Sequence, residues 1–497
     1  MKKFSEVRVR MAPSPTGFFH VGSARTALYN WLFAQHNKGK FILRIEDTDV
    51  ERSSEDMLKV VLEGMAWLGM DQYEGPYYQS KRIDIYKKHI EKLIKEGKAY
   101  YCYCDPQNLK KERQAAYEKK EDWKYDRRCL SLSEADQKKK EQSNEPKAVR
   151  FLVPDHGVTY KDIVYGEISR DSKDIEDFII QRANGTPTYN LACVVDDYEM
   201  GITHVIRGAD HITNTPKQIL LYEALNLQKP EFAHLPLILG KDKSKLSKRH
   251  GAVSLREYQE KGFLPDALVN YLALLGWSPG DDQELFMRRR ISDMGTVDMS
   301  KLAAQFTLEC ISKANAVFDT TKLEWMNQQY IMQLPHPKFK ELLKPFIIKS
   351  GLMTAQEIEH KADWLTKVCF LMQPRLKTLS DIDKNGRFFF KDDFPYEQDT
   401  LKKYLDKETL HMMQKLSQRI KEIHPFDDVD VGEIEIKLRD YGSNKNLKVK
   451  QWIHPLRVYV TGCAGGPPLF DTLQLIGKER CVKRINNILK EYGRLND

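Results

Sequence analysis

The chain has 497 residues, 41% apolar and 30% charged, which is ordinary for globular proteins but too long for one compact core, so several domains are predicted. No run of about 18 apolar residues occurs, and residues 1–10 lack the apolar centre of a secretory signal, which argues against a membrane span and against export. Eight cysteines argue against a disulfide framework and favour a reducing cytoplasm, while the formal charge of +8 is compatible with a polyanionic partner.

The first 50 residues predict a strand, a loop, a helix and a second strand. Residues 7–11 alternate apolar side chains with arginines, as in a strand with one buried face. The segment 13–17 (PSPTG) ends that strand, and a helix is predicted to begin near Gly22. The apolar run 41–45 then suits a buried parallel strand. This βαβ unit should have a right-handed crossover.

Three apolar runs later in the chain are candidates for further strands of the same sheet. They cover residues 191–195, 204–206 and 235–239. Between the second and third runs, Thr215 and Pro216 supply a helix N-cap and a first-turn proline. These pieces predict an α/β fold with a doubly wound, parallel, Rossmann-like sheet that is interrupted by a long insertion.

The insertion is predicted to contain charged helices at 110–126 and 133–147, followed by strands at 148–153 and 158–168. Beyond residue 335 the pattern is mainly helical, as at 337–349 and 354–369. The predicted divisions are the first half of the α/β domain (1–87), an inserted α/β domain (88–182), the second half of the α/β domain (183–238), a segment that contains a basic loop (239–335) and two helical domains (336–398 and 399–497).

The loop 13–23 (PSPTGFFHVGS) is the strongest local signal. His20 and Gly22 lie between a strand and a helix, at the edge where open α/β sheets bind ligands. A helix N-terminus favours phosphate, Gly22 allows close approach to the backbone, and His20 can donate to phosphate oxygens. Taken alone, an HxG tripeptide is more often a turn with a surface histidine.

A second signal is the basic loop 241–249 (KDKSKLSKR), directly after a predicted strand. Its lysines are placed to neutralise charge that builds on a triphosphate during phosphoryl chemistry. Because no GxxxxGK[ST] occurs, this is not a Walker-type site. A solvated basic loop is the alternative, and KxSK alone favours that alternative.

Together, HxG after the first strand and KxSK after a late strand resemble the paired signature of class I aminoacyl-tRNA synthetases. Neighbouring segments resemble bacterial-type glutamyl-tRNA synthetases over nearly the whole chain. These segments are 10–17 (RMAPSPTG), 44–49 (RIEDTD), 187–189 (PTY), 205–208 (VIRG), 245–249 (KLSKR), 263–265 (FLP), 325–327 (WMN), 455–457 (PLR) and 460–462 (VTG).

The resemblance implies that 1–87 and 183–238 are the two halves of a catalytic domain, 88–182 a connective (acceptor-binding) domain, 239–335 a stem-contact domain, and 336–398 and 399–497 anticodon-binding domains. It also implies three overlapping groups of site residues. Arginines suit carboxylates, and an acid suits the ammonium group of an amino acid. The residues implied are Arg10, Ala12, Ser14, Glu46, Tyr189 and Arg207 for glutamate; Pro13, Thr16, Gly17, His20, Gly22, Ser23 and Lys248 for ATP; and His20, Gly22, Lys245, Ser247 and Lys248 for catalysis.

Ordinary structural roles remain open for several of these residues. Arg10 is alternatively an exposed strand arginine, and Arg207 a partner of Asp196 or Asp210. Glu46 is alternatively part of a solvated acidic turn, and Tyr189 a core aromatic residue. Cys193 stands where some relatives have asparagine, so we do not assign it to the pocket.

The implied reaction has two steps. Glutamate attacks the α-phosphate of ATP, giving glutamyl-adenylate and pyrophosphate, and the 2′-hydroxyl of the terminal adenosine of tRNA(Glu) then takes the glutamyl group. No enzyme nucleophile is needed, so positioning and electrostatics should carry catalysis. The resemblance also implies Mg²⁺ with ATP, bound tRNA as a requirement for activation, and a monomer.

Cys102, Cys104 and Cys129 match three positions of a zinc knob found in some relatives. The fourth position is Ser131, a poor zinc ligand, and His156 is remote, so we expect no zinc and no other resident metal. In the tail, Arg375 aligns with an arginine that helps relatives to reject glutamine tRNA. The alternative for Arg375 is a role in loop packing.

Three rival hypotheses were considered. A glutaminyl-tRNA synthetase would have β-barrels where this tail reads as helical, and a glutamyl-queuosine tRNA synthetase would lack the tail. A silent tRNA-binding paralogue should have lost His20, Gly22 or Lys248, which are all present. Charging of glutamine tRNA in addition to glutamate tRNA stays open.

Overall fold

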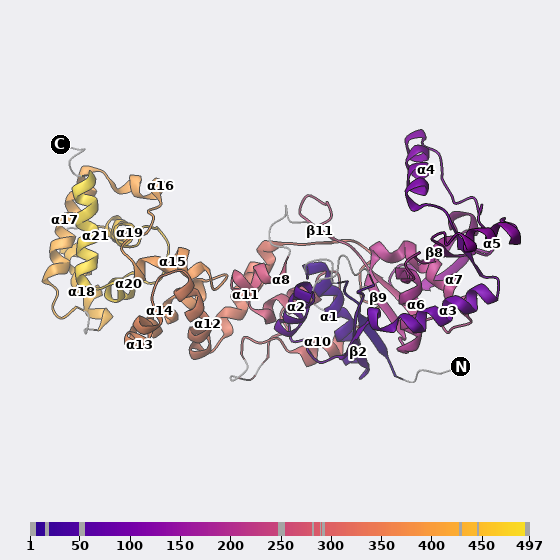
Figure 1. Cartoon of the computed structure of the whole chain (residues 1–497). Helices are drawn as coiled ribbons and strands as arrows, with labels where there is room; N and C mark the ends of the chain where they lie inside the picture. Colours follow the sequence, from indigo (N-terminus) through magenta and orange to yellow (C-terminus); the bar gives the residue numbers. More distant parts are fainter. Residues whose placement is uncertain are drawn as a thin grey trace. The chain divides into compact units, whose positions relative to one another are not determined.

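A computed structural model of the chain describes residues 6–14, 19–48, 55–246, 254–280, 283–288, 290, 294–426, 430–444 and 447–492. The chain forms two compact units, and their elements are labelled in Figure 1. The first unit comprises Met1–Glu257, Val269–Phe286 and Asp298–Asp319, and the second comprises Tyr258–Leu268, Met287–Val297 and Thr320–Asp497. Within the described ranges, no helix is both long and apolar enough to cross a bilayer.

The first sheet of unit one is parallel and has the strand order β1-β2-β3. It consists of β1 (Arg8–Met11), β2 (Lys40–Ile45) and β3 (Glu74–Tyr78), with α1 (Val21–His36) between β1 and β2. Five of the six residues of β2 are buried, as expected for a central parallel strand. The predicted strand, helix and strand at the N-terminus are therefore confirmed.

The second sheet has the order β7-β6-β10-β9. Three of its strands are parallel: β9 (His204–Gly208), β10 (Glu231–Leu235) and β6 (Val158–Asp162). The fourth, β7 (Gly166–Arg170), pairs antiparallel with β6 as a hairpin. The predicted strand at 158–168 is thus two strands, because a turn at residues 163–165 separates them. Both strands lie within the predicted insertion, yet they belong to the second sheet: β6 pairs with β10, and β7 pairs with β6. We call this second sheet the main sheet.

The two sheets adjoin where β1 meets the start of β9. The backbone N–H of Thr203 donates to the carbonyl of Arg8 at 2.9 Å, and the N–H of Arg8 donates to the Thr203 hydroxyl at 2.9 Å. The carboxyl ends of β1 and β9 therefore lie side by side. In doubly wound α/β proteins this edge is where ligands bind.

Two strand predictions were wrong. Residues 191–195 belong to helix α6 (Tyr189–Glu199), because a short, fully buried apolar run has no period that separates strand from helix. The run 235–239 is divided: β10 ends at Leu235, and after Pro236 the short strand β11 (Ile238–Leu239) pairs with β12 (Ala316–Val317) in a separate sheet. Proline has no N–H for a sheet ladder, which explains the break.

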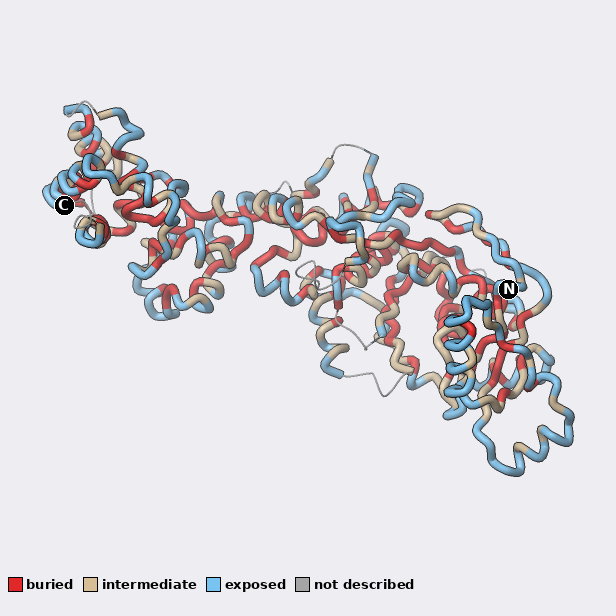
Figure 2. Tube along the Cα trace, turned by 90° about the horizontal axis from the view of Figure 1, so that it is seen from above, coloured by how far each residue is buried: buried red, intermediate tan, exposed pale blue. Residues whose placement is uncertain are grey.

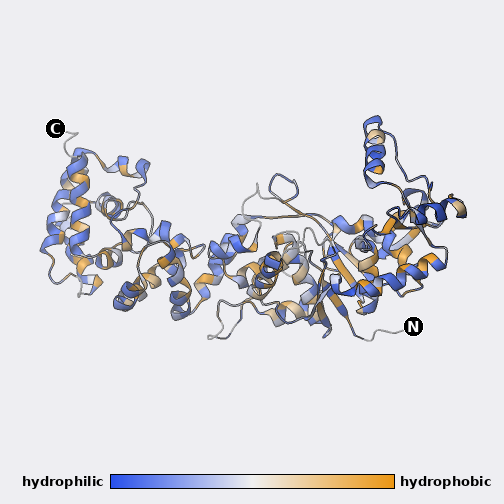
Figure 3. Ribbon diagram, in the orientation of Figure 1, coloured by the Kyte–Doolittle hydropathy of each residue, from blue (hydrophilic) through white to orange (hydrophobic). Residues whose placement is uncertain are grey.

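The rest of the predicted insertion forms a small antiparallel sheet with the order β4-β5-β8 and two mainly hydrophilic helices (Figure 3). The helices start at side-chain caps from Asp105 and Ser133 and are shorter than predicted. The bounds are β4 (Ala99–Cys102), β5 (Ala148–Phe151), β8 (Phe178–Gln181), α4 (Pro106–Lys119) and α5 (Glu134–Gln142).

The part of unit two that follows residue 320 is helical, as predicted. Leu410, Met413, Leu416 and Ile420 are buried along one face of α17, the spacing of an amphipathic helix, and Figure 2 shows buried residues alternating with exposed ones along such helices. The bounds are α11 (Thr320–Gln333), α12 (His336–Lys349), α13 (Ala355–His360), α14 (Ala362–Met372), η6 (Gln373–Arg375), α15 (Asp381–Phe390), α16 (Gln398–Leu401), η7 (Lys402–Tyr404), α17 (Lys407–Glu422), α18 (Val431–Asn444), α19 (Val449–Thr461), α20 (Leu469–Ile476) and α21 (Lys478–Tyr492).

The remaining helices connect and cover the strands of the catalytic region. Helix α7 begins at Thr215 with Pro216 in its first turn, as predicted, but Thr215 is not the N-cap: Asn214 holds that position without a side-chain cap hydrogen bond, and the Thr215 hydroxyl accepts from Arg207 instead. The bounds are α2 (Glu55–Trp67), η1 (Gln79–Arg82), α3 (Ile83–Lys95), η2 (Ser172–Asp174), η3 (Ala209–Asn214), α7 (Thr215–Leu225), α8 (Leu255–Glu260), α9 (Pro265–Ala273) and α10 (Met299–Gln305).

Candidate active site

A cavity of about 580 Å³ opens at the carboxyl ends of β1 and β9, beside the N-terminus of α1. Segments far apart in the sequence line it, as expected at this edge of an α/β sheet. Eleven of the predicted site residues line the cavity: Arg10, Ala12, Pro13, Ser14, His20, Gly22, Ser23, Glu46, Tyr189, Arg207 and Lys245. Thr16, Gly17, Ser247 and Lys248 lie outside the described residues.

His20 is the N-cap of α1. Its Nδ1 accepts a hydrogen bond from the backbone N–H of Ser23 at 3.2 Å, so the ring folds back over the first turn of the helix. A Cβ at position 22 would lie 3.0 Å from His20 Cε1 and 3.1 Å from Nδ1. Glycine at this position therefore makes room for the capping imidazole as well as for a ligand.

The lysine loop reaches the same cavity. The Lys245 ammonium lies 3.8 Å from a carboxylate oxygen of Asp210, and both residues line the cavity with His20. Burial and the neighbouring charge of Lys245 lower the pKa of His20, which favours a neutral ring at neutral pH. The HxG and KxSK segments thus converge on one cavity, at least as far as Lys245.

Arg10, which lines the cavity, shares one carboxylate with Arg44. Arg10 donates from Nε and Nη2 to the two oxygens of Asp197, at 3.0 and 3.2 Å, and Arg44 Nη1 donates to Asp197 Oδ1 at 2.5 Å. All three side chains are buried. Burial alone would raise the pKa of Asp197, but Arg10 and Arg44 outweigh it and hold that pKa at about 2.

Glu46 joins this cluster from the end of β2. Its carboxylate accepts from Arg44 Nη2 at 3.2 Å, and its backbone N–H donates to the carbonyl of Pro13 at 3.0 Å. Burial raises the pKa of Glu46 more than Arg44 and Arg10 lower it. An ammonium group bound in the cavity would favour the ionised form, so Glu46 is suited to holding the α-amino group of an amino acid.

Arg207 is buried on β9, and the hydrogen bonds of its guanidinium all go to uncharged acceptors. They are the Tyr189 hydroxyl at 3.3 Å from Nη1, Thr215 Oγ1 at 2.7 Å from Nη2 and His234 Nε2 at 3.2 Å from Nε. Among the described residues, no carboxylate lies within 4.0 Å of this guanidinium. Arg207 is therefore available to pair with a carboxylate on a ligand.

The two expected alternatives for Arg207 do not apply in the described structure. Asp196 is buried and accepts hydrogen bonds from Gln79, Arg82 and Tyr86, while Asp210 faces Lys245. Tyr189 is the first residue of α6, and its hydroxyl also lies 3.1 Å from Nδ1 of His211. It points toward polar neighbours of the cavity rather than serving only as a core aromatic.

Cys193 lies behind the cavity and is not among its lining residues. Its sulfur is 3.8 Å from Arg10 Nη2 and 3.6 Å from Arg44 Nη2, and the thiol donates to Asp197 at 3.5 Å. Burial raises the pKa of Cys193 to about 12, so the thiol is neutral. It packs against the arginine cluster as an uncharged group.

Several functional neighbours were missed at the level of sequence. Arg44, Asp197, Asp210 and His211 belong to the same region, yet only Arg44 carried a usable signal. An arginine inside the buried run KFILRI needs a carboxylate partner, because charged side chains are rarely buried unpaired. The partner itself, Asp197, is 153 positions away and could not be identified from the sequence.

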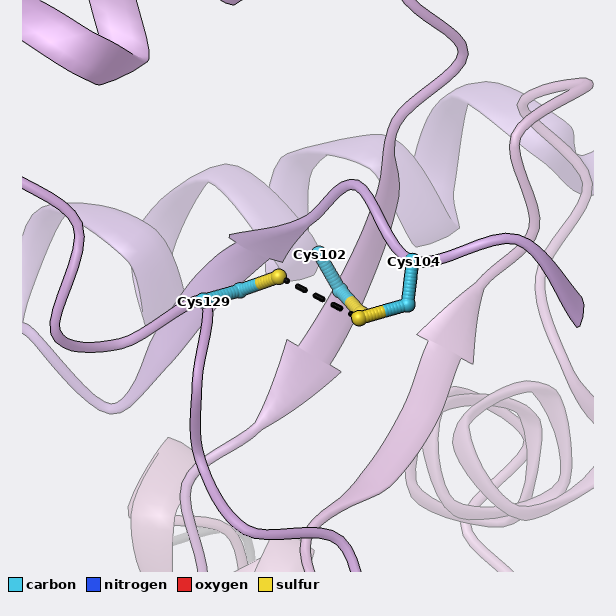
Figure 4. A group of neighbouring side chains, drawn as sticks. All are labelled: Cys102, Cys104 and Cys129. Carbon is cyan, nitrogen blue, oxygen red and sulfur yellow. Dashed lines mark hydrogen bonds between the residues drawn. The ribbon is translucent and has the colours of Figure 1, made fainter. Parts of the chain in front are cut away.

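The three cysteines of the predicted zinc-knob positions gather at the end of β4. Their sulfurs all lie within 4.8 Å of one another, with Cys104 and Cys129 at 3.5 Å (Figure 4). The Tyr125 hydroxyl oxygen lies 3.5 Å from the sulfur of Cys104 and is the further atom beside the cluster that could contact a metal. Of the described residues, no fourth cysteine or histidine completes the cluster, so the donor set is short of a usual structural zinc site.

Arg375 ends the 3-10 helix η6 in the second unit. Its Nη1 donates to the carbonyl of Leu371 at 2.6 Å, and the side chain is half-buried. This contact matches the loop-packing alternative, while the remaining guanidinium nitrogens are compatible with a nucleic-acid contact. The discriminating role stays a prediction.

Comparison with known protein families agrees with this architecture. Residues 6–325 match the family described as tRNA synthetases class I (E and Q), catalytic domain. Residues 338–489 match the family described as anticodon binding domain. The chain therefore has the fold of a class I aminoacyl-tRNA synthetase.

Individual relatives narrow the assignment. The chain is 44% identical to the glutamate–tRNA ligase of Thermodesulfovibrio yellowstonii (97% of this chain, 99% of the relative) and 43% identical to glutamate–tRNA ligase 2 of Thermoanaerobacter pseudethanolicus (98% of each). A crystal structure of a glutamate tRNA ligase from Elizabethkingia meningosepticum in complex with its amino acid has a TM-score of 0.83 at 33% identity, covering 98% of this chain and all of that one. The chain belongs to the glutamate–tRNA ligase family.

Proposed function

We propose that this protein activates L-glutamate with ATP to glutamyl-adenylate and pyrophosphate, and then transfers glutamate to the 3′-terminal adenosine of tRNA(Glu). One observation carries the proposal. A single cavity is lined by Arg10, Glu46 and Arg207 and also by His20 and Lys245. Such a cavity suits an amino acid with two carboxylates beside a nucleotide phosphate.

The chemistry follows from positioning rather than from an enzyme nucleophile. Arg10 and Arg207 would hold the carboxylates, Glu46 the α-amino group, and the N-terminus of α1 with His20 the phosphates. Mg²⁺ is expected to accompany ATP and to neutralise phosphate charge. The eight free thiols are compatible with a reducing cytoplasm, and we propose that the enzyme acts there as a monomer.

The test of the proposed function is aminoacylation of purified tRNA(Glu) and tRNA(Gln) with labelled glutamate and labelled glutamine. We expect glutamate on tRNA(Glu), dependent on ATP. Because Arg375 matches the discriminating relatives, tRNA(Gln) should remain uncharged. Attachment of glutamine, or of neither amino acid, would contradict the proposal, whereas glutamate on both tRNAs would overturn only the discrimination.

Arg207→Ala should raise the KM for glutamate about 10–100-fold, which corresponds to the roughly 1.5–3 kcal/mol of a hydrogen bond to a charged group. The guanidinium has uncharged protein partners, so its charge is available to the ligand. The KM for ATP should stay within about twofold of the wild-type value, because Arg207 is not expected to bind ATP. Loss of one hydrogen bond to a phosphate would raise that KM by more than about twofold. Steady-state aminoacylation measures both, and unaltered glutamate kinetics would make Arg207 a structural residue.

Gly22→Ala should raise the KM for ATP roughly fivefold, or about 1 kcal/mol, the usual cost of a disturbed N-cap. The new methyl group would press on the imidazole of His20, which caps α1 beside the cavity. Pyrophosphate exchange in the presence of tRNA measures the effect. Gly465→Ala is the control, because a Cβ there meets nothing within 4 Å, and equal kinetics in the two variants would refute this explanation.

Zinc analysis of the purified protein should find far less than one zinc per chain. Cys102, Cys104 and Cys129 supply three sulfurs, but the next donor is a phenol oxygen rather than a cysteine or histidine. Elemental analysis after preparation without chelators checks this. One equivalent of zinc that disappears in Cys104→Ser would show the expectation to be wrong.

A further inference from the structure

Behind Arg207 lies a buried polar pair that no step of the reaction uses. His234 is on β10, fully buried, and its Nδ1 lies 2.6 Å from a carboxylate oxygen of Asp162 on β6. Neither residue lines the cavity. They contact the lining residue Arg207 directly, because its Nε lies 3.2 Å from the other ring nitrogen of His234, and also through Thr215, whose hydroxyl lies 3.0 Å from that nitrogen and accepts from Arg207.

The contacts fix which nitrogen of His234 carries the proton. Asp162 Oδ1 accepts from the backbone N–H groups of Val164 and Tyr165 at 3.0 and 2.9 Å, which anchors the carboxylate. Its Oδ2 is then an acceptor for Nδ1–H of His234. Nε2 is left as a lone pair facing the N–H of Arg207, since the two ring nitrogens have opposite roles in a neutral imidazole. Burial lowers the pKa of His234, which agrees with a neutral ring.

An imidazole between Asp162 and Arg207 has a specific electrostatic result. A carboxylate in direct contact offsets part of the charge of the guanidinium it holds, as Asp197 does for Arg10 and Arg44, which share it. A ring nitrogen instead fixes the orientation of Arg207 while its positive charge is retained for the ligand. Thr215 acts in the same way, because its hydroxyl oxygen accepts from Nη2 of Arg207 at 2.7 Å.

We propose that Asp162 and His234 are positioning residues that orient Arg207 for the carboxylate of the amino-acid substrate. The inference rests on the proposed function, because it assigns the recognition of glutamate to Arg207. It also gives the inserted segment a part in amino-acid recognition, since Asp162 belongs to it. Groups that orient metal ligands from behind typically change affinity or activity about 10–100-fold when removed, and we expect an effect of the same size here.

The test compares two amide replacements of His234. In His234→Asn the amide N–H can still reach Asp162, but the acceptor for Arg207 is lost, whereas in His234→Gln the side-chain oxygen can reach the position of Nε2. We expect the KM for glutamate to rise about 10–100-fold in the asparagine variant and clearly less in the glutamine variant. The KM for ATP should stay close to the wild-type value in both.

Asp162→Asn provides an independent test. Its side-chain oxygen should stay with the N–H groups of Val164 and Tyr165, which turns its NH₂ toward His234. The ring must then accept at Nδ1 and carry the proton on Nε2, against the N–H of Arg207. We expect a rise in the KM for glutamate similar to that of His234→Asn, with the melting temperature and the KM for ATP recorded for each variant.

The outcomes separate the two proposals. If the wild-type protein attaches no glutamate to tRNA, the proposed function is wrong whatever the variants do. If it does, equal losses in the asparagine and glutamine variants, a parallel rise in the KM for ATP, or wild-type glutamate kinetics in Asp162→Asn would overturn the positioning role. Selective loss with partial recovery in His234→Gln supports it.

Discussion

Lys248→Ala is expected to slow adenylate formation by about 10²–10³-fold, the usual cost of removing one group that stabilises transition-state charge. Lys248 lies outside the described residues, but Lys245, three positions earlier, lines the cavity beside His20. The ammonium of Lys248 should act on the charge of the α-phosphate and the departing pyrophosphate. Pyrophosphate exchange in the presence of tRNA measures this step.

The affinity for tRNA should be nearly unchanged in the same variant, as measured by filter binding. Lys241→Ala is the matched control, because it removes the same charge from the same loop where the lysine pairs with Asp319 at 3.1 Å and does not line the cavity. The control should keep near wild-type rates. If Lys248→Ala and Lys241→Ala formed adenylate at comparable rates, Lys248 would not be a catalytic residue.

The second large effect is expected in Asp197→Ala, which should lose about 3–5 kcal/mol of stability. The substitution leaves Arg10 and Arg44 buried without the carboxylate that they share. Urea denaturation followed by circular dichroism measures the loss. Asp84→Ala is the control, since that side chain is 92% exposed, and its effect should stay within about 0.5 kcal/mol.

The same carboxylate predicts how stability depends on pH. Arg10 and Arg44 hold the pKa of Asp197 at about 2, below its ordinary value of 3.8. A lowered folded-state pKa means that the contribution is complete above about pH 4 and is lost as the pH falls toward 2. The wild type and Asp197→Ala should therefore differ most at neutral pH and converge in acid. A constant difference between pH 7 and pH 2 would contradict this account.

The resemblance predicted which residues gather at one cavity better than the apolar runs predicted the strands. The helix after HxG was predicted because the turn segment 13–17 is followed by apolar residues on one helical face, with Gly39 just past its end. Arg10, Glu46, Tyr189 and Arg207 were implied by resemblance, and the structure brings them to one cavity. The strand prediction for 191–195 was wrong because five buried apolar residues show no periodicity that separates a strand from a helix. The strand prediction for 235–239 was wrong because Pro236 divides the run.

The groups that position the site could not be read from the sequence. Asp197 and Arg10 are 187 positions apart, and Asp162 and His234 are 72 apart. Asp197, Asp162 and His234 stand in ordinary local segments, and no motif marks them. Only the pairing of β6 with β10 and the packing of α6 under β1 and β2 bring these partners together, so their roles depend on tertiary structure.

The interleaving of the inserted segment limits how the enzyme can be shortened. Strands β4 and β5 belong to the small sheet, the hairpin β6–β7 returns to the main sheet, and β8 goes back to the small one. No single excision that removes the small sheet spares the hairpin β6–β7 of the larger one. A minimal enzyme that retains Asp162 would instead need its cut between β4 and β5, with α4 and α5 replaced by a short linker, and a deletion of residues 88–182 would expose the edge of β10 to solvent and to other chains.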